Sequence, residues 1–494
     1  MKNDIDTINL PPLIGDLVTD SKTWIDNLFA DTWKQLKVNG LIQQAGLSKR
    51  SGIGIEESVY LLLLWSWLNM SSIAMFSRKA LGCFTQARKD VMYDLLKRED
   101  SNWRALNLSM AKQVYRQQGL ANRKIKALVL DDSIKQRRGR KMEGISSHYD
   151  HVSGGYVIGQ QVLTLGLATE DSFLPLDSQI FISQSQSTEL KRPYQDDRSI
   201  VSQRYREATT QSKPEMADKM IKRAIRKGLN ADYLVADAWF GTKAMLRTAC
   251  DQSLCAIVRM KKGKLKYRLE SSEGQQMLTA LELYSVAVKR EWKKVHGLPW
   301  KSVSLEVEVD ISTQEEKEAQ WKTVKLLFVR GLKEIDDRDA SKKDWALFLS
   351  TDATMSTKRM LEIYSLRWGI EVYFKEAKQH LGFLKEQTFS FASHTASIHL
   401  CAIRYLMLVY NKLNDREHSI GEIRSNIQEQ LDGIHFATKL WQIFRAVITD
   451  ALKDLKKLLG SSVTTIMQAI DDKIQAFFVH SLQLDTFTMR LEYE

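Results

Sequence analysis

The spacing of apolar residues changes along the chain and predicts several kinds of region. Residues 20–120 repeat at helical spacing, with "ESVYLLLLWSWL" as a core segment. Short apolar runs then predict strands, and amphipathic stretches between them predict helices. The predicted strands are 127–130, 154–169, 172–183, 231–237 and 254–260, and the predicted helices are 213–229 and 242–252. This order favours a mixed α/β sheet over a doubly wound parallel one.

The pattern changes again after residue 260. "KSVSLEVEVDIS", "WKTVKLLFVRG" and "DWALFLST" are strand-like, which predicts a β-rich insertion over residues 260–350. Helical spacing returns after residue 384, as in "HTASIHLCAIRYLMLVYNKL". A helical N-terminal region (1–121) and a helical C-terminal region (386–494) are therefore expected to precede and follow the sheet.

The charge of the chain points to an anionic partner. An excess of Lys and Arg that gives a net charge of +12 is costly unless something negative compensates it. Nucleic acid is the leading partner class, and an acidic membrane surface is the alternative. The uncharged stretch at 58–77 is long enough to raise the question of a membrane span, but Asn69 and its serines favour a buried core helix.

Cysteine spacing and the N-terminal residues bear on the compartment. The four cysteines have no zinc-ligand spacing, so we expect reduced thiols. The first residues carry acids and prolines where an export signal has a basic end and an apolar run. A cytoplasmic protein without a membrane partner is expected.

The stretch "YSLRWGIEVYFKEAKQHLGF" (364–383) is predicted to be one amphipathic helix. At about 100° per residue, Tyr364, Arg367, Glu371 and Lys378 fall within an arc of about 60°, and the strip is about 21 Å long. A cationic strip with one carboxylate in its middle fits a polyanion that runs along the helix. A solvated polar face is the alternative interpretation.

Three acidic positions belong to these elements. The first strand ends in Asp131 and Asp132, a later strand ends in Asp237, and Glu371 lies on the helix. If the strands are neighbours and the helix packs on the sheet edge, one pocket collects three carboxylates. Such a pocket suits Mg²⁺ or Mn²⁺, and two ions about 3.5–4 Å apart can promote phosphodiester cleavage. Taken singly, each acid is also compatible with a turn cap or a solvated side chain.

The helix resembles the Y-R-E-K signature of DDE transposases from bacterial insertion sequences. In that signature Tyr, Arg, Glu and Lys are separated by two, three and six residues, and the four residues named above match it without a gap. "LDDS" (130–133) looks like the first motif of the family, which favours Asp131 with Asp132 as the alternative. "LVADAWFG" (234–241) is similar to the second motif and supplies Asp237.

The resemblance covers roughly residues 122–385 and implies an RNase H-like core. The core would consist of residues 122–259 and 351–385, interrupted by the β-rich insertion, with a DNA-binding domain at 1–121. Asp131, Asp237 and Glu371 would hold two Mg²⁺ or Mn²⁺ ions.

The resemblance also implies DNA contacts. Tyr364 and Arg367 would hold the DNA near the cut, and Lys378 would contact its backbone. Trp345 matches the place of a tryptophan that stacks on, or replaces, a flipped base in members that form hairpin ends; a core position is the alternative.

Other marked stretches are less specific. "KQRRGRK" is expected to contact phosphate, with a solvated loop as the alternative, and its cations are Lys135, Arg137, Arg138, Arg140 and Lys141. "HYDH" (148–151) has metal-ligand residue types without a closing partner and is predicted to be a turn. Trp239 and Phe240, which follow Asp237, are expected in the core.

The predicted function is a transposase that binds the terminal repeats of its own element. Water would attack first, hairpin ends are the expected intermediates, and the freed 3′-hydroxyl would attack target DNA. Because two ends are joined in one event, a homodimer on DNA, associated with the bacterial nucleoid, is expected. The alternatives are a metal-dependent endonuclease that cuts without joining and an inactive DNA-binding relative.

Overall fold

The computed structural model describes most of the chain in two compact units. The described residues are 28–85, 87–139, 141–150, 154–185, 187–271, 274–313, 316, 318–331, 344–386, 388–459, 465–468 and 470. One unit, here called the helical unit, comprises Met1–Val114, Arg192–Ser202 and Glu376–Glu494; the other, the sheet unit, comprises Tyr115–Lys191 and Gln203–Lys375. The five domain boundaries drawn from the sequence stay predictions.

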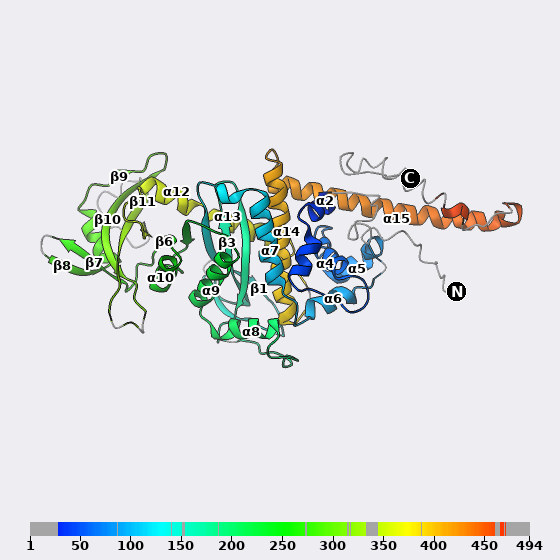
Figure 1. Cartoon of the computed structure of the whole chain (residues 1–494), viewed down its shortest axis with the longest axis horizontal. Helices are drawn as coiled ribbons and strands as arrows, with labels where there is room; N and C mark the ends of the chain where they lie inside the picture. The colour runs from blue at the N-terminus through cyan, green and yellow to red at the C-terminus, as the bar shows by residue number, and fades with distance from the viewer. Residues whose placement is uncertain are drawn as a thin grey trace. The chain divides into compact units, whose positions relative to one another are not determined.

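The helical unit contains only helices and loops among its described residues (Figure 1). Its helices are α2 (Leu28–Gln35), α3 (Val38–Gln44), α4 (Ile55–Leu64), α5 (Ile73–Lys79), η1 (Leu81–Cys83), α6 (Asp90–Lys97), most of α7 (Trp103–Gln117), α14 (Phe391–Asn414) and α15 (Ile420–Leu459). The helical spacing read from the sequence is thereby confirmed for both regions.

The helix α14 forms the core of this unit and is buried along nearly its whole length. Its Arg404 is fully buried and donates hydrogen bonds to the carbonyls of Leu62, Leu63 and Leu381. Carbonyls at the end of a helix have no intrahelical partner, so the guanidinium satisfies groups that burial would otherwise leave unpaired. The buried arginine thus joins α14 to the end of α4.

The apolar stretch at 58–77 forms part of this core. It divides into the end of α4 and the start of α5, joined through Asn69, which has a positive φ of 51°. Among the described residues, no helix combines the length and apolar character that a bilayer crossing requires. The prediction of a buried core segment is confirmed.

The sheet unit is built on one mixed sheet (Figure 1). Its strands are β1 (Ala127–Gln136), β2 (Ser146–Asp150), β3 (Gly155–Ala168), β4 (Phe173–Phe181), β5 (Tyr233–Ala236), β6 (Cys255–Arg259), β7 (Lys266–Ser271), β8 (Gly274–Thr279), β9 (Lys293–Lys294), β10 (Trp300–Asp310), β11 (Trp321–Gly331) and β12 (Trp345–Ser350). Its helical elements are η2 (Leu120–Asn122), α8 (Ile200–Thr210), α9 (Lys213–Arg226), α10 (Lys243–Asp251), α11 (Ala280–Val288), α12 (Thr357–Ser365) and α13 (Trp368–Gln379), of which α8 and α13 cross the division between the units.

The first part of the sheet has the strand order β4-β3-β1-β5-β6. β3 is antiparallel to β1 and β4, whereas β5 and β6 run parallel to β1. The apolar runs of β1, β5 and β6 are buried because helices cover the sheet on both faces. The predicted α/β class with a mixed, RNase H-like sheet is confirmed.

The strands of the predicted insertion extend this sheet instead of forming a separate one. β12 pairs antiparallel with β6, and the order continues β12-β11-β10-β7-β8. The strict alternation of "SVSLEVEVD" has its physical basis here, because Val303, Leu305, Val307 and Val309 of β10 are buried on one face.

Two local predictions are wrong. The stretch 364–383 is not one helix: α12 ends at Ser365, α13 begins at Trp368, and the link is a tight turn in which Arg367 N bonds to Tyr364 O at 3.1 Å. The segment "HYD" is not a turn but belongs to β2, where His148 pairs with Val157. His151 lies outside the described residues.

Candidate active site

Asp131 and Asp237 lie directly after the paired residues of two neighbouring parallel strands. Leu130 of β1 pairs with Ala236 of β5, so the next residue along each strand is one of the two aspartates. Neighbouring strands lie about 5 Å apart, which brings the two side chains to the same edge. β1 continues to Gln136 along β3, so Asp131 lies where the parallel pairing ends and not, as predicted, where the strand ends.

Glu371 lies in the first turn of α13 and is joined to Asp131 through Arg367. One terminal nitrogen of the Arg367 guanidinium (Nη1) lies 3.1 Å from Asp131 Oδ2, and the other (Nη2) contacts Glu371 Oε1. All three side chains are at least partly buried, with exposures of 21% for Arg367, 20% for Asp131 and 36% for Glu371. A bridging arginine is the geometry in which two carboxylates share one delocalised cation.

The environment of Asp131 disfavours its charge. Burial, and then the negative charge of Asp237, raise the pKa of Asp131 to about 7, and Arg367 only partly offsets this. Two nearby carboxylates that cannot both ionise easily are typical of sites that bind a cation or handle a proton.

Tyr364 lies at the end of α12 beside the same arginine. Its ring packs edge-on against Phe348 with centroids 4.7 Å apart, and the guanidinium carbon of Arg367 lies 5.8 Å from its centroid. Burial raises the pKa of the Tyr364 hydroxyl, so the residue remains a neutral hydrogen-bond donor at physiological pH.

Gly369 lets α13 approach the sheet closely enough to deliver Glu371. A Cβ at this position would lie 3.1 Å from Cβ of Phe173, closer than carbon atoms normally pack. The neighbouring Tyr373 packs on the same phenylalanine with centroids 5.9 Å apart. The distance of Glu371 from the two aspartates therefore depends on a glycine two residues before it.

Two protein-family models match the part of the chain that contains these residues. The DDE superfamily endonuclease model matches residues 71–277, and the transposase DDE domain model matches residues 195–407. The first matched segment contains Asp131, the second contains Glu371, and both contain Asp237. The chain belongs to the DDE-type transposases. A search among curated proteins gave no match.

Asp132 of this transposase points away from the other acids. Lys213 Nζ lies 2.6 Å from Asp132 Oδ2, and Gln161 Nε2 donates to Asp132 Oδ1 at 2.8 Å. Successive strand residues face opposite sides of a sheet, so Asp132 cannot share a site with Glu371 while β1 stays extended. Of the two alternatives left open by the sequence, the geometry favours Asp131.

Two residues near the transposase site were missed from the sequence. Arg259 follows Val258 of β6, which pairs with Ala236, so it is in register with Asp237 one strand further along and is exposed. Trp368 begins α13 next to Arg367 and is 65% exposed. The sequence does carry a signal for Arg259. Both "YLVA" and "CAIV" are short apolar runs, and the first is followed by the acid Asp237 whereas the second is followed by the cation Arg259.

Trp345 is not available for base stacking in this structure. It is 4% exposed and stacks face to face on Tyr284 at a centroid distance of 4.2 Å, and Lys262 Nζ lies 3.9 Å from its ring centroid. The assignment of Trp345 as a DNA contact is therefore replaced by the core position that was its alternative. The reason is that its strand position on β12 turns the indole into the interior.

The remaining predicted DNA contacts lie in several places. Lys135 belongs to β1, Arg137 donates to Gln160 Oε1 at 2.9 Å, and Arg138 and Lys141 are exposed. Arg140 lies outside the described residues. Lys378 lies in the last turn of α13. These positions leave the phosphate-contact prediction open.

Enzymes of the DDE superfamily generally use divalent metal ions, and the donor chemistry here fits such ions. Asp131, Asp237 and Glu371 are oxygen ligands of the kind that Mg²⁺ and Mn²⁺ prefer, and the repulsion between the two aspartates would be relieved by a cation. Among the described residues, no group of three or more His, Cys, Asp or Glu side chains is already gathered closely enough to hold a metal ion. Arg367 instead holds Glu371.

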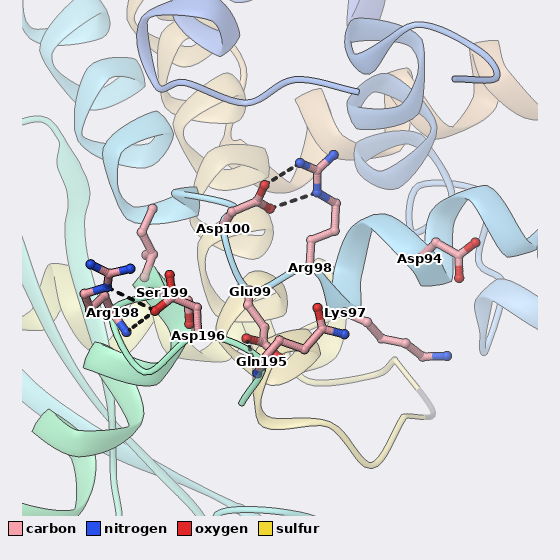
Figure 2. A pocket seen from close by; sticks show the side chains of 10 residues that line it. Asp94, Lys97, Arg98, Glu99, Asp100, Gln195, Asp196, Arg198 and Ser199 are labelled. Atoms are coloured by element: carbon pink, nitrogen blue, oxygen red, sulfur yellow. Dashed lines mark hydrogen bonds and ion pairs between the residues drawn. The ribbon is translucent and has the colours of Figure 1, made fainter. Parts of the chain in front are cut away.

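The helical unit has a charged pocket of about 580 Å³ (Figure 2). Arg98 and Asp100 form an ion pair across it at 2.5 Å, and Glu99 accepts from the backbone N–H of Gln195 at 3.1 Å. Asp196 is likewise bonded to Arg198. The pocket lies where residues 192–202 pack beside the end of α6, and it contains none of the predicted site residues.

Proposed function

We propose that this transposase cuts DNA at the ends of its own element and joins them to a target, with Asp131, Asp237 and Glu371 as its catalytic carboxylates. The supporting observation is the register of β1 and β5, in which the residues next after the last pair are Asp131 and Asp237, together with the arginine that joins Asp131 to Glu371. Phosphoryl transfer needs little from a protein beyond positioning and charge, and this edge of the sheet supplies both.

The same carboxylates would hold two divalent ions, Mg²⁺ or Mn²⁺. When bound, such ions activate the attacking oxygen and stabilise the leaving oxygen. Metal binding would displace the proton that Asp131 holds when it is protonated, because burial, and then the charge of Asp237, raise its pKa to about 7. For Glu371 to join it, Arg367 has to release one carboxylate.

The cations and aromatic side chains around the acids would hold the DNA. When the ion pair between Arg367 and Glu371 breaks, the guanidinium becomes available to a DNA phosphate. The Tyr364 hydroxyl can donate a hydrogen bond to a second phosphate. Arg259 adds a third phosphate contact beside Asp237. Trp368 is the exposed aromatic residue next to Arg367 and is proposed, in place of Trp345, to stack on a base that leaves the helix.

A homodimer is part of the proposal because two ends must be processed in one event. On α15, Phe436, Ile443 and Val447 are 57%, 62% and 64% exposed. Their spacing of seven and four residues puts them within about 40° of one another on the helix. A continuous exposed apolar strip marks an interaction surface, and we assign it to a second copy of the chain.

This assignment is tested by Val447→Glu. A charge at the C-terminal end of the strip should shift the protein toward monomer in sedimentation velocity, whereas Lys439→Glu on the same helix, where the lysine is exposed, should not. Unchanged association of the Val447 variant would remove the strip from the interface.

The product pattern separates the transposase from its two alternatives. The purified protein is incubated with Mn²⁺ and DNA that carries the inverted repeats flanking its gene. Hairpin or joined products support the proposal. Cutting without joining identifies an endonuclease, and binding without any product identifies an inactive relative.

A single variant checks the active-site assignment in the same assay. Glu371→Gln should bind DNA normally and give no product, because the amide cannot replace the carboxylate as a metal ligand. Glu362→Gln, on α12 and 48% exposed, is the matched control and should behave as wild type. Normal cutting by Glu371→Gln would reject the assignment.

A further inference from the structure

Lys213 occupies a position that is unfavourable for a lysine. It is the first residue of α9, directly after the N-cap Ser212, and only 6% of its side chain is exposed. The start of a helix carries a partial positive charge, so a buried cation there is opposed both by the helix dipole and by the loss of water. Its partners have to compensate for these costs.

The partners of Lys213 are one carboxylate and two aromatic rings. Its Nζ lies 2.6 Å from Asp132 Oδ2, 4.3 Å from the ring centroid of Trp239 and 5.3 Å from that of Phe181. Contact with an indole face stabilises a desolvated ammonium, because the face of the ring carries partial negative charge. The ammonium is thus held between an anion and the electron-rich face of a tryptophan.

Asp132 and Trp239, the two nearest partners of Lys213, lie in the same chain segments as Asp131 and Asp237. Asp132 follows Asp131 on β1, and the backbone N–H of Trp239 donates to Asp237 Oδ1 at 2.9 Å. Asp132 and Asp131 face opposite sides of β1. One lysine on the far face of the sheet therefore contacts both acid-bearing segments without touching either catalytic carboxylate.

We propose that Lys213 is a positioning residue that ties the end of the β1–β5 pairing to the turn after β5, and so sets the separation of Asp131 and Asp237. This inference rests on the proposed function, because it assigns those two aspartates as metal ligands. Replacing a residue that orients metal ligands without binding the metal itself typically weakens metal affinity about 10- to 100-fold.

The chain offers a control for a merely structural ion pair. On the same helix, Arg223 is paired at 2.8 Å with Asp177, whose side chain is fully buried. Arg223→Met removes the cation from the carboxylate of Asp177, as Lys213→Met removes it from the partly exposed Asp132, but Arg223 touches neither acid-bearing segment. The two variants should lose similar folding stability and differ only in what happens at the site.

The test measures Mn²⁺ affinity by electron paramagnetic resonance of the free ion, and DNA cutting and binding in parallel. Lys213→Met should bind Mn²⁺ at least about tenfold more weakly and cut DNA more slowly, with an unchanged Kd for DNA. Arg223→Met should bind Mn²⁺ as wild type does. Wild-type Mn²⁺ affinity in Lys213→Met, or an equal loss in Arg223→Met, overturns the inference.

A double variant covers the case in which Lys213→Met does not fold. Lys213→Met with Asp132→Asn leaves no carboxylate without its cation, yet Trp239 still loses its contact with the Lys213 ammonium and keeps the more distant Lys261, whose Nζ lies 5.3 Å from the ring centroid. Mn²⁺ affinity should remain at least about tenfold reduced, and recovery to the wild-type value overturns the inference. Failure of the wild-type protein to cut DNA would instead reject the proposed function.

Discussion

Replacing Gly369 by alanine is expected to slow DNA cutting while leaving the protein folded. The added Cβ would lie 3.1 Å from Cβ, 3.2 Å from Cδ2 and 3.3 Å from Cγ of Phe173. Carbon atoms pack at about 3.5–4.0 Å, so the start of α13 has to move by a few tenths of an ångström. Cβ of Phe173 belongs to a strand and cannot turn aside as the end of a flexible side chain would.

The magnitudes predict different effects on stability and on activity. Overpacking costs about 1–3 kcal/mol, and alanine recovers up to about 1 kcal/mol over glycine in a helix, so the free energy of unfolding should fall by no more than about 2 kcal/mol. Glu371 lies two residues further along the displaced helix. Because a misplacement of about 1 Å can cost about 100-fold in rate, a shift of a few tenths of an ångström should lower the cutting rate by up to about 10-fold.

The assay compares single-turnover cutting with urea unfolding for two glycine variants. Gly421 is the second residue of α15, as Gly369 is of α13, but a Cβ there would meet only Ser419 Oγ at 3.8 Å. Gly421→Ala should therefore keep the wild-type rate. A wild-type rate in Gly369→Ala would show that the close packing of α13 on β4 does not position Glu371.

Three further predictions concern DNA contacts and pH. Arg259→Ala should weaken DNA binding and reduce the slope of log K against log salt by about 1, because one phosphate contact is lost. Trp368→Ala should lower the yield of hairpin or joined ends with little loss of stability, whereas Trp345→Ala should destabilise the fold by about 3–5 kcal/mol, as measured by urea unfolding. Burial, and then the charge of Lys213, lower the pKa of His148 to about 4 from 6.5. The folded protein therefore binds fewer protons than the unfolded one between these values and loses about 3 kcal/mol as the pH falls from 6.5 to 4, a loss that His148→Gln should remove in unfolding measurements across that range.

The positions of Asp131 and Asp237 could be predicted from the sequence because a buried strand has a simple local pattern. Apolar runs that end in an acid predicted that Asp131 and Asp237 would follow buried strands, and the carboxyl ends of parallel strands meet at one edge. The choice between Asp131 and Asp132 needed the structure, because both flank the same run. It is the alternation of strand side chains that turns Asp132 toward Lys213.

Other features depend on tertiary contacts that no local pattern carries. The apolar spacing runs unbroken through Leu366, so it could not reveal the turn between α12 and α13. The register of Arg259 with Asp237 requires the strand order, which the sequence does not state. Trp345 was placed on the right strand but assigned to the DNA, because periodicity alone does not show that Tyr284 covers its ring.

The most direct test of the account removes each proposed carboxylate in turn. Asp131→Asn, Asp237→Asn and Glu371→Gln are compared with Asp251→Asn, an exposed acid of the same unit that pairs with Arg247, outside the site. The account predicts that Mn²⁺-dependent cutting falls at least about 1,000-fold in all three, with DNA affinity retained, and is unchanged in the control. Wild-type cutting by any one of the three would contradict it.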